Sequence, residues 1–180
     1  QLEGQPLILG NHRLIEERGL CSPAIEALLQ AQESQGRTVT LLASQSEVLA
    51  IFAVADTIKD SSREAIAQLH ALGIASVMLT GDNRRTAEAV RQKLGISEVV
   101  AEVLPQDKEK KVSELKAQGH KVAMIGDGIN DSPALSAANV GIAISDGAEI
   151  AREIADITVS SDDLYQIVTL KLLSDSLMER

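Results

Sequence analysis

The chain has 180 residues, 44% of them hydrophobic, so one or two domains with a core of aliphatic side chains can form. Lys and Arg number 17 against 26 Asp and Glu, and this formal charge of −9, with only 1% aromatic residues, argues against a nucleic-acid partner. The single cysteine, Cys21, excludes a disulfide framework and a multi-cysteine zinc site. No signal-peptide pattern and no apolar run of the roughly 20 residues that a membrane helix needs is present. We therefore expect a soluble, cytosolic, acidic α/β module.

The first fifty residues predict a small α+β piece. Ser22 and Pro23 are a favourable N-cap and first residue for a helix, and Gly19 and Gly36 are typical helix-closing residues. The expected elements are an apolar run at 6–9, helices at 12–18 and from 22 to 36, and extended runs at 38–43 and 48–54. The pattern of expected helices and strands changes near 53–56. We therefore expect one domain over 1–52 and a second over 53–180.

From Asp56 onward the sequence alternates between strand and helix patterns. The expected helices lie at 62–72, 84–94, 108–117, from 133, at 149–155 and at 162–178, and the expected strands at 76–79, 99–104, 121–125, 140–144 and 157–159. Because the strands are apolar throughout, both of their faces should be buried. This pattern predicts an α/β fold with a doubly wound parallel sheet.

Three polar clusters follow expected strands, where doubly wound sheets bind their ligands. They are Asp56 with Asp60, Thr80-Gly81-Asp82, and Asp127 with Asn130-Asp131. Asp127 and Asp131 lie one helical turn apart in a glycine-rich turn, and two carboxylates held together repel unless a cation joins them. Mg²⁺ fits, since it takes one or two carboxylates and keeps waters for a phosphate. The alternative is that Asp131 only caps the helix that Pro133 begins.

The other two candidates are weaker when taken alone. Thr80-Gly81-Asp82 offers a hydroxyl and backbone N–H groups near a helix N-terminus, which suits a phosphate, but it could equally be an N-cap. Lys108 begins an expected helix just after Leu104-Pro105. It would neutralise a phosphoryl oxygen if it pointed to the strand ends, or be solvated like most surface lysines.

Three strings in this order and spacing resemble the phosphorylation domain of P-type ATPases, which has a haloacid-dehalogenase-like fold. They are Thr80-Gly81-Asp82-Asn83, Leu104-Pro105-Gln106-Asp107-Lys108, and the run from Gly126 to Leu135 that reads GDGINDSPAL. The resemblance covers about 48–180 and, more weakly, 1–47. Leu7-Ile8-Leu9-Gly10-Asn11 is similar to the end of the small nucleotide-binding domain of the heavy-metal-transporting class. A bacterial potassium-pump subunit, the alternative relative, tends to have Thr where this chain has Ile129.

The resemblance implies roles in phosphoryl transfer, with Mg²⁺ and ATP as cofactors. Asp127 and Asp131 correspond to the magnesium site, which Asn130 supports, and Lys108 to the lysine that binds the aspartyl phosphate. Thr80 and Gly81 correspond to contacts with phosphoryl oxygens. Asp82 corresponds to a residue near the Mg²⁺ and the hinge between domains.

The resemblance also implies a nucleotide site. Gly10 and Asn11 match positions that contact the nucleotide, and Asp56 matches the acidic residue at the junction between domains. His12 stands where the family often has Arg, so one phosphate contact differs from the usual one.

The chain lacks the Asp-Lys-Thr-Gly-Thr string that holds the family's nucleophile, and also the His-Pro and Gly-x-Gly elements of the nucleotide domain. The resemblance therefore implies a piece that begins inside the nucleotide domain and stops before a membrane segment. The full protein would be a pump in the cell membrane that couples ATP hydrolysis, through an aspartyl phosphate, to transport of a heavy-metal cation. We expect the piece alone, a cytosolic region, to be inactive.

Two alternatives remain open. A free-standing phosphatase of the same fold would need Asp56 as its nucleophile, but the second acid expected two residues later is absent. A nucleotide-binding module without catalysis is the other. In the family fold, the strand that carries the nucleophile lies between the strands ending at Thr80 and Gly126. Without it, we expect a second chain, an upstream segment or direct pairing of these two strands to fill the gap, or else self-association.

Overall fold

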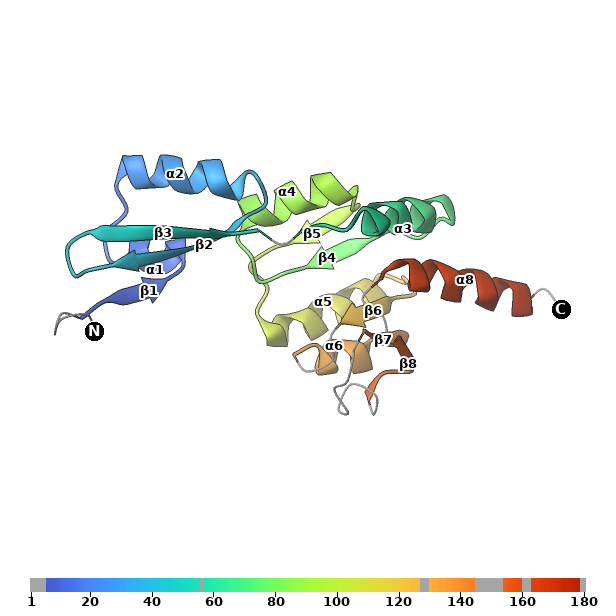
Figure 1. Ribbon diagram of the computed structural model, residues 1–180. Helices are drawn as coiled ribbons and strands as arrows, with labels where there is room; N and C mark the ends of the chain where they lie inside the picture. Colours follow the sequence, from blue (N-terminus) through green and yellow to red (C-terminus); the bar gives the residue numbers. More distant parts are fainter. Residues whose placement is uncertain (1–5, 56, 127–129, 145–153, 160–162, 179–180) are drawn as a thin grey trace. The chain divides into compact units, whose positions relative to one another are not determined.

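The structure, a computed structural model, describes residues 6–55, 57–126, 130–144, 154–159 and 163–178 (Figure 1). The chain divides into two compact units. The first comprises Gln1–Ile58 and Asp82–Lys93, and the second Lys59–Gly81 and Leu94–Arg180. The segment Asp82–Lys93 is thus grouped with the N-terminal residues, while the expected domain boundary at residue 52 stays a prediction.

The first unit is built on a three-stranded antiparallel sheet in the order β1-β2-β3. Its elements are β1 (Ile8–Gly10), α1 (His12–Glu17), α2 (Pro23–Glu33), β2 (Thr38–Ala43), β3 (Val48–Val54) and most of α4 (Arg84–Leu94). Strands β2 and β3 form a hairpin in which Ser44 Oγ accepts hydrogen bonds from the backbone N–H groups of Ser46 and Glu47. A hydroxyl used in this way stabilises a tight turn.

The core of this unit lies between one face of β2 and helices α1 and α2. Alternate residues of β2, Val39, Leu41 and Ala43, are buried, as the two-residue repeat of a strand with one covered face requires. They pack with Ile15 of α1 and Leu29 of α2, both fully buried. The two helices are therefore fixed against the sheet by apolar contacts.

Helix α4 is joined to the end of α2 by polar contacts. Glu33, only 2% exposed, accepts a 2.8 Å hydrogen bond from Asn83 Nδ2 and lies 3.4 Å from Arg85 Nη1. The Thr86 hydroxyl donates to the carbonyl of Arg37 at 2.9 Å. A buried carboxylate needs such partners, so the contacts compensate the desolvation of Glu33.

The second unit contains two parallel ladders, β4-β5 and β6-β7-β8. Its elements are α3 (Asp60–Ala71), β4 (Val77–Leu79), β5 (Glu98–Val100), α5 (Pro105–Ala117), β6 (Ala123–Gly126), α6 (Ser132–Ala137), β7 (Val140–Ile144), β8 (Ile157–Val159) and α8 (Tyr165–Met178). In the ladders of the described residues, β4 pairs with β5 alone and β6 with β7 alone. Direct pairing of β4 with β6, one of the expected ways to fill the gap, is thus not seen in this part of the chain.

Helices cover both faces of the β6-β7-β8 sheet. Ile142 of β7 is buried with Ala65 and Leu69 of α3 and with residues of α8. Met124 of β6 is buried with residues of α5 and α6, namely Val112, Ala134 and Leu135. The two-sided burial that the apolar strands predict is confirmed, and with it the doubly wound α/β fold class.

Several element bounds differ from the expected ones. Strand β5 ends at Val100, four residues earlier than expected, because the chain turns at Glu102, whose φ is +58°. Helix α5 begins at Pro105 rather than at 108, since proline has the backbone angle of a first helical residue and lacks an N–H that would need a partner. The bounds of β2, β3, α4, β7 and β8 are as expected.

None of the helices in the described part of the chain combines the length and hydrophobicity needed to cross a lipid bilayer. The expected helix at 149–155 lies mostly outside the described residues.

Candidate functional site

Lys108 and Asp131, two of the sequence-predicted site residues, are in direct contact. Lys108 Nζ donates to Asp131 Oδ1 at 2.8 Å, and the two side chains are only 19% and 12% exposed. Lys108 lies in the first turns of α5, and Asp131 lies between β6 and α6. A lysine that would otherwise be solvated is therefore held at the carboxyl end of β6, where this fold class binds ligands.

Asp131 occupies the N-cap position of α6, but its side chain makes no capping hydrogen bond. The side chain instead lies over the end of β6, so close to Gly126 that a Cβ on that residue would stand 2.6 Å from Oδ2. The capping alternative therefore does not account for this carboxylate. Its orientation leaves it paired with Lys108 at the strand end.

Thr80 is connected to the same region through the segment that precedes α5. The backbone N–H of Thr80 donates to Val100 at 3.1 Å, and its carbonyl accepts from Val103 at 3.0 Å. These bonds tie the end of β4 to the chain just before Pro105, where α5 begins. Because the Thr80 N–H is already bonded, a phosphate at this position would have to use its hydroxyl or the N–H groups that follow.

Gly81 and Asp82 lie on either side of the division between the two compact units. A Cβ added to Gly81 would meet only Val103 O, at 3.7 Å, an ordinary contact. Asp82 accepts a 3.0 Å hydrogen bond from the Thr38 hydroxyl, within the first unit. Asn83, not Asp82, caps α4, since Asn83 Oδ1 accepts from the Thr86 N–H at 2.9 Å.

The predicted nucleotide-contacting residues lie together at the start of α1. Asn11 caps this helix, with Oδ1 accepting from Leu14 N at 3.0 Å, which leaves its amide NH₂ as a donor to a ligand. Gly10 is in close contact with the Leu14 side chain, so any larger residue would displace Leu14. The His12 ring bonds through Nε2 to Glu26 Oε2 at 2.7 Å.

Asp56 and Asp127, the predicted junction residue and magnesium ligand, lie outside the described residues. Asn130 is described and exposed. The Asp131 carboxylate is an oxygen donor held at a strand end, which is the ligand type that Mg²⁺ prefers, and Lys108 is bonded to one of its two oxygens.

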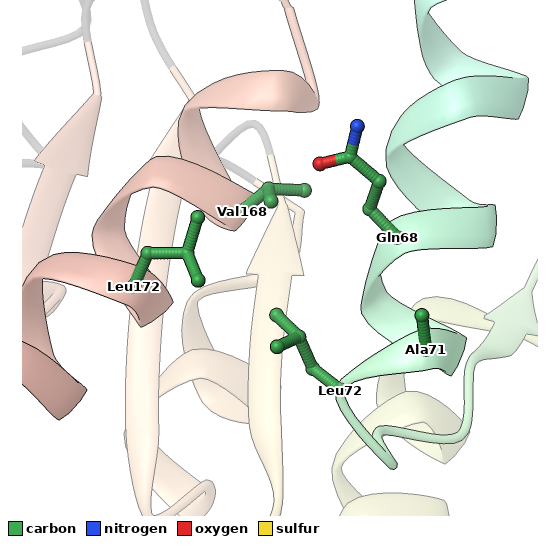
Figure 2. Close-up of a pocket in the computed structure, with 5 residues that line it drawn as sticks. All are labelled: Gln68, Ala71, Leu72, Val168 and Leu172. Carbon is green, nitrogen blue, oxygen red and sulfur yellow. The ribbon is translucent and has the colours of Figure 1, made fainter.

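A shallow pocket between α3 and α8 is lined by Gln68, Ala71, Leu72, Val168 and Leu172 (Figure 2). None of these side chains is charged, and four of the five are apolar. The lining offers no group that would neutralise a phosphate or coordinate a metal ion, so the pocket is not part of the candidate site.

Two residues that the sequence did not single out as ligands, Cys21 and Glu26, lie against His12. Cys21 Sγ lies 3.6 Å from His12 Nε2 and 3.7 Å from Glu26 Oε2. Cys21 lies nine residues after His12 and five residues before Glu26, and this spacing matches no sequence motif. Only the folded connection between α1 and α2 brings them together.

Comparisons with known proteins show the family of the chain. The profile of the haloacid dehalogenase-like hydrolase family matches residues 4–139. The chain is 45% identical over 164 residues to a copper-exporting P-type ATPase of Bacillus subtilis, covering 91% of this chain and 20% of that protein. It is 44% identical over 169 residues to a probable copper-exporting P-type ATPase V of Mycobacterium tuberculosis, covering 93% of this chain and 22% of that protein.

A solved structure of a zinc-transporting PIB-type ATPase in its E2.Pi state superposes with a TM-score of 0.65 and 38% identity, covering 94% of this chain and 28% of that one. The chain thus spans about a fifth of the length of the curated relatives it matches. The resemblance to heavy-metal P-type ATPases is confirmed by these comparisons. By its sequence and by its doubly wound fold, the chain belongs to the haloacid dehalogenase-like hydrolase family.

Proposed function

We propose that this chain contributes the phosphorylation region, and part of the nucleotide-binding region, of a heavy-metal P-type ATPase. The observation that carries the proposal is the contact between Lys108 and Asp131 at the end of β6. Asp131 occupies the N-cap position of α6 but makes no capping hydrogen bond, and its carboxylate pairs with the lysine instead. A cation and a carboxylate held together at a strand end are suited to phosphoryl chemistry, which needs charge neutralisation and positioning.

Lys108 would neutralise the oxygens of a transferred phosphoryl group. Its ammonium has three N–H donors, and Asp131 engages the group at 2.8 Å, which holds it in position. Thr80 and Gly81 would contact the same oxygens. The link from Thr80 to Val103 supports this role, because it joins the end of β4 to the segment that leads into α5 and Lys108.

Asp127 and Asp131 would hold Mg²⁺, with Asn130 and Asp82 supporting the metal and the phosphoryl group. When bound, Mg²⁺ supplies positive charge to phosphoryl oxygens. Asp131 would then share its two oxygens between the metal and Lys108. Gly126 makes this possible, because it leaves room for the carboxylate directly above the strand.

Gly10, Asn11 and His12 would form one wall of the ATP site, with Asp56 at the junction between domains. Among the residues that the structure describes, Asn11 uses only Oδ1 in the cap, so its amide NH₂ is available as a donor. The rest of the pocket would come from a longer protein. That protein would lie in the cell membrane, with this region in the cytosol, and its further partner would be the transported metal cation.

The experiment that tests this function is acid-stable labelling with radioactive ATP. It compares this chain with a longer protein in which an upstream Asp-Lys-Thr-Gly-Thr segment is joined to it. We expect the longer protein alone to be labelled, and Lys108→Ala to lower the labelling rate about 100-fold or more. Lys110→Ala, which removes an exposed lysine of the same helix, should leave the rate unchanged.

Two results would contradict the proposal. Equal labelling of Lys108→Ala and Lys110→Ala would show that Lys108 has no part in the reaction. An acyl phosphate on Asp56 of this chain alone would instead favour a free-standing phosphatase.

A further inference from the structure

Three side chains with different metal-binding atoms meet near the start of α1. His12 Nε2, Cys21 Sγ and Glu26 Oε2 lie within 4.8 Å of one another. The separations are 3.6 Å from sulfur to nitrogen, 3.7 Å from sulfur to oxygen and 2.7 Å from nitrogen to oxygen. In the part of the chain that the structure describes, no other group of three His, Cys, Asp or Glu side chains is as close.

The local fold holds these three residues in place. Asn11 caps α1, so His12 is its first residue. Gly19, with a φ of +69°, turns the chain back after α1, and Ser22 caps α2 through the Ile25 N–H. Cys21 therefore directly precedes one capped helix, and Glu26 lies in that helix. The ligand atoms come from two helix starts rather than from a long loop, so little ordering is needed to bring them together.

The distances fit a tetrahedral zinc-type site. With a metal–sulfur bond of about 2.3 Å and metal–nitrogen and metal–oxygen bonds of about 2.0–2.2 Å, tetrahedral geometry separates sulfur from either neighbour by about 3.6 Å and nitrogen from oxygen by about 3.4 Å. The two sulfur distances already agree with these values. The nitrogen–oxygen distance is shorter because His12 and Glu26 form a hydrogen bond, and it would lengthen by about 0.7 Å on metal binding.

The surroundings suit a metal that is bound from solvent. The His12 and Glu26 side chains are 22% and 36% exposed, so an ion can reach them and a water can take the fourth position. Arg85 Nη1 holds the other carboxylate oxygen, Oε1, at 2.8 Å. A hydrogen bond of this kind orients a ligating carboxylate and leaves Oε2 directed at the metal position.

The protonation states of Glu26 and Cys21 in the metal-free protein affect metal binding in opposite directions. The hydrogen bond from Arg85 lowers the pKa of Glu26, which therefore stays ionised at neutral pH. Burial, and then the charge of Glu26, raise the pKa of the Cys21 thiol. The thiol is neutral until a metal displaces its proton, as metal binding to cysteine generally requires.

We propose that His12, Cys21 and Glu26 form a binding site for a divalent metal ion of the zinc type, with water as the fourth ligand. Thiolate and imidazole ligands select borderline metals such as Zn²⁺ over Mg²⁺, so this site differs in selectivity from the carboxylate site at Asp131. The alternative is a hydrogen-bonded His–Glu pair that happens to lie beside a thiol.

The test uses Co²⁺ as a spectroscopic substitute for Zn²⁺, added to the full 180-residue chain under reducing conditions. Excess Mg²⁺ is present throughout to occupy carboxylate sites. Because Cys21 is the only cysteine, any sulfur-to-cobalt charge-transfer band comes from that residue. We expect such a band, with the intense visible absorption of tetrahedral Co²⁺, and we expect Zn²⁺ to abolish both.

Substitutions of the three residues test whether each side chain is a metal ligand. Cys21→Ser should remove the band, and His12→Asn and Glu26→Gln should each weaken Zn²⁺ competition for bound Co²⁺ at least tenfold, since even loss of an outer hydrogen bond to a ligand typically costs about 10–100-fold. His120→Asn removes an exposed histidine from the second unit and should bind like the parent. Circular dichroism of each variant checks that it is folded.

Two outcomes would overturn the proposal. The first is a parent chain that shows no charge-transfer band at saturating Co²⁺. The second is parent-like affinity in both His12→Asn and Glu26→Gln, which would mean that Cys21 binds the ion alone. The parent measurement needs no variant to fold, so it decides the first point whatever the variants do.

Discussion

The side chain of Asp131 lies against the backbone of Gly126, leaving no space for a methyl group between them. A Cβ on Gly126 would stand 2.6 Å from Asp131 Oδ2 and 2.7 Å from its Cβ. Because the Cβ of Asp131 is itself involved, rotating the carboxylate away would not relieve the overlap. Gly126 therefore positions the carboxylate that pairs with Lys108.

Gly126→Ala should displace Asp131 and break its contact with Lys108. We expect a loss of about 1–3 kcal/mol in the free energy of unfolding, measured by urea denaturation, as is typical of an overpacked site. Gly81→Ala is the matched control, because its added Cβ meets only Val103 O at 3.7 Å and should change stability much less. Equal losses in the two variants would contradict the steric argument.

The pair of Lys108 and Asp131 should show a measurable interaction energy. Its side chains are 19% and 12% exposed, so solvent screens the pair less than it screens a surface salt bridge. A double-mutant cycle with Lys108→Met and Asp131→Asn should give a coupling of about 0.5–3 kcal/mol. The exposed pair Arg13–Glu17, with exposures of 84% and 60%, should give little or none. A coupling no larger than in that control would show that the contact is not maintained in solution.

Much of the fold could be predicted from local signals, but the contacts of the site could not. The bounds of α4 were predictable because Asn83 and Gly95 mark its two ends. Strand β5 was predicted too long, since the residues up to Leu104 are apolar apart from Glu102 and nothing in the sequence shows that the chain turns there.

Lys108 and Asp131 were each singled out, for a phosphate and for Mg²⁺ respectively. The two residues are 23 positions apart in the chain and belong to different elements, and hydrophobic periodicity predicts no contacts at that separation. The roles themselves stay predictions. The cluster of His12, Cys21 and Glu26 had no sequence signal at all, because it depends on how the turn at Gly19 places α2 beside α1.

Glu102 should be replaceable by glycine without loss of stability. It is the one non-glycine residue with a positive φ, +58°, among those described, and it is exposed. A left-handed backbone costs a residue with a Cβ about 1–2 kcal/mol, whereas glycine gives up about 0.5–1 kcal/mol of chain entropy. Glu102→Gly should therefore have an unchanged or slightly higher Tm. Glu102→Val, which adds β-branching at the same exposed position, should have a lower Tm, and the opposite order would contradict this account of the turn.

The ionised Glu88 carboxylate should stabilise the folded protein at neutral pH, and this contribution should be lost at low pH. Hydrogen bonds from Arg91 and then Gln92 lower its pKa from 4.5 to about 2. A carboxyl group whose pKa is lowered by folding stabilises the protein above its unfolded pKa, and this contribution disappears as the pH falls through the folded pKa. The stability difference between the parent and Glu88→Gln should thus be present at neutral pH and decline between pH 4.5 and 2. An NMR titration of the Glu88 carboxyl group measures the pKa directly, and a midpoint near 4.5 would contradict the prediction.

The open edges of β4 and β6 should accept a further strand. In the described ladders β4 pairs with β5 and β6 with β7, so each has one edge whose backbone groups that ladder leaves unpaired. An unpaired buried N–H or C=O group costs about 1–3 kcal/mol, and an exposed edge promotes association. We therefore expect the chain to self-associate with increasing concentration in sedimentation experiments. A peptide with an apolar strand followed by Asp-Lys-Thr-Gly-Thr should reduce this association and raise the Tm.

The control peptide has the same composition with proline at alternate strand positions, since proline removes the N–H groups that a ladder requires. It should leave both association and Tm unchanged if strand addition is the mechanism. Equal effects of the two peptides would indicate nonspecific binding of apolar residues. A chain that is monomeric, melts cooperatively and responds to neither peptide would contradict this prediction. It would show that the backbone groups at the edges of β4 and β6 already have hydrogen-bond partners, because unpaired strand edges would otherwise bind the first peptide.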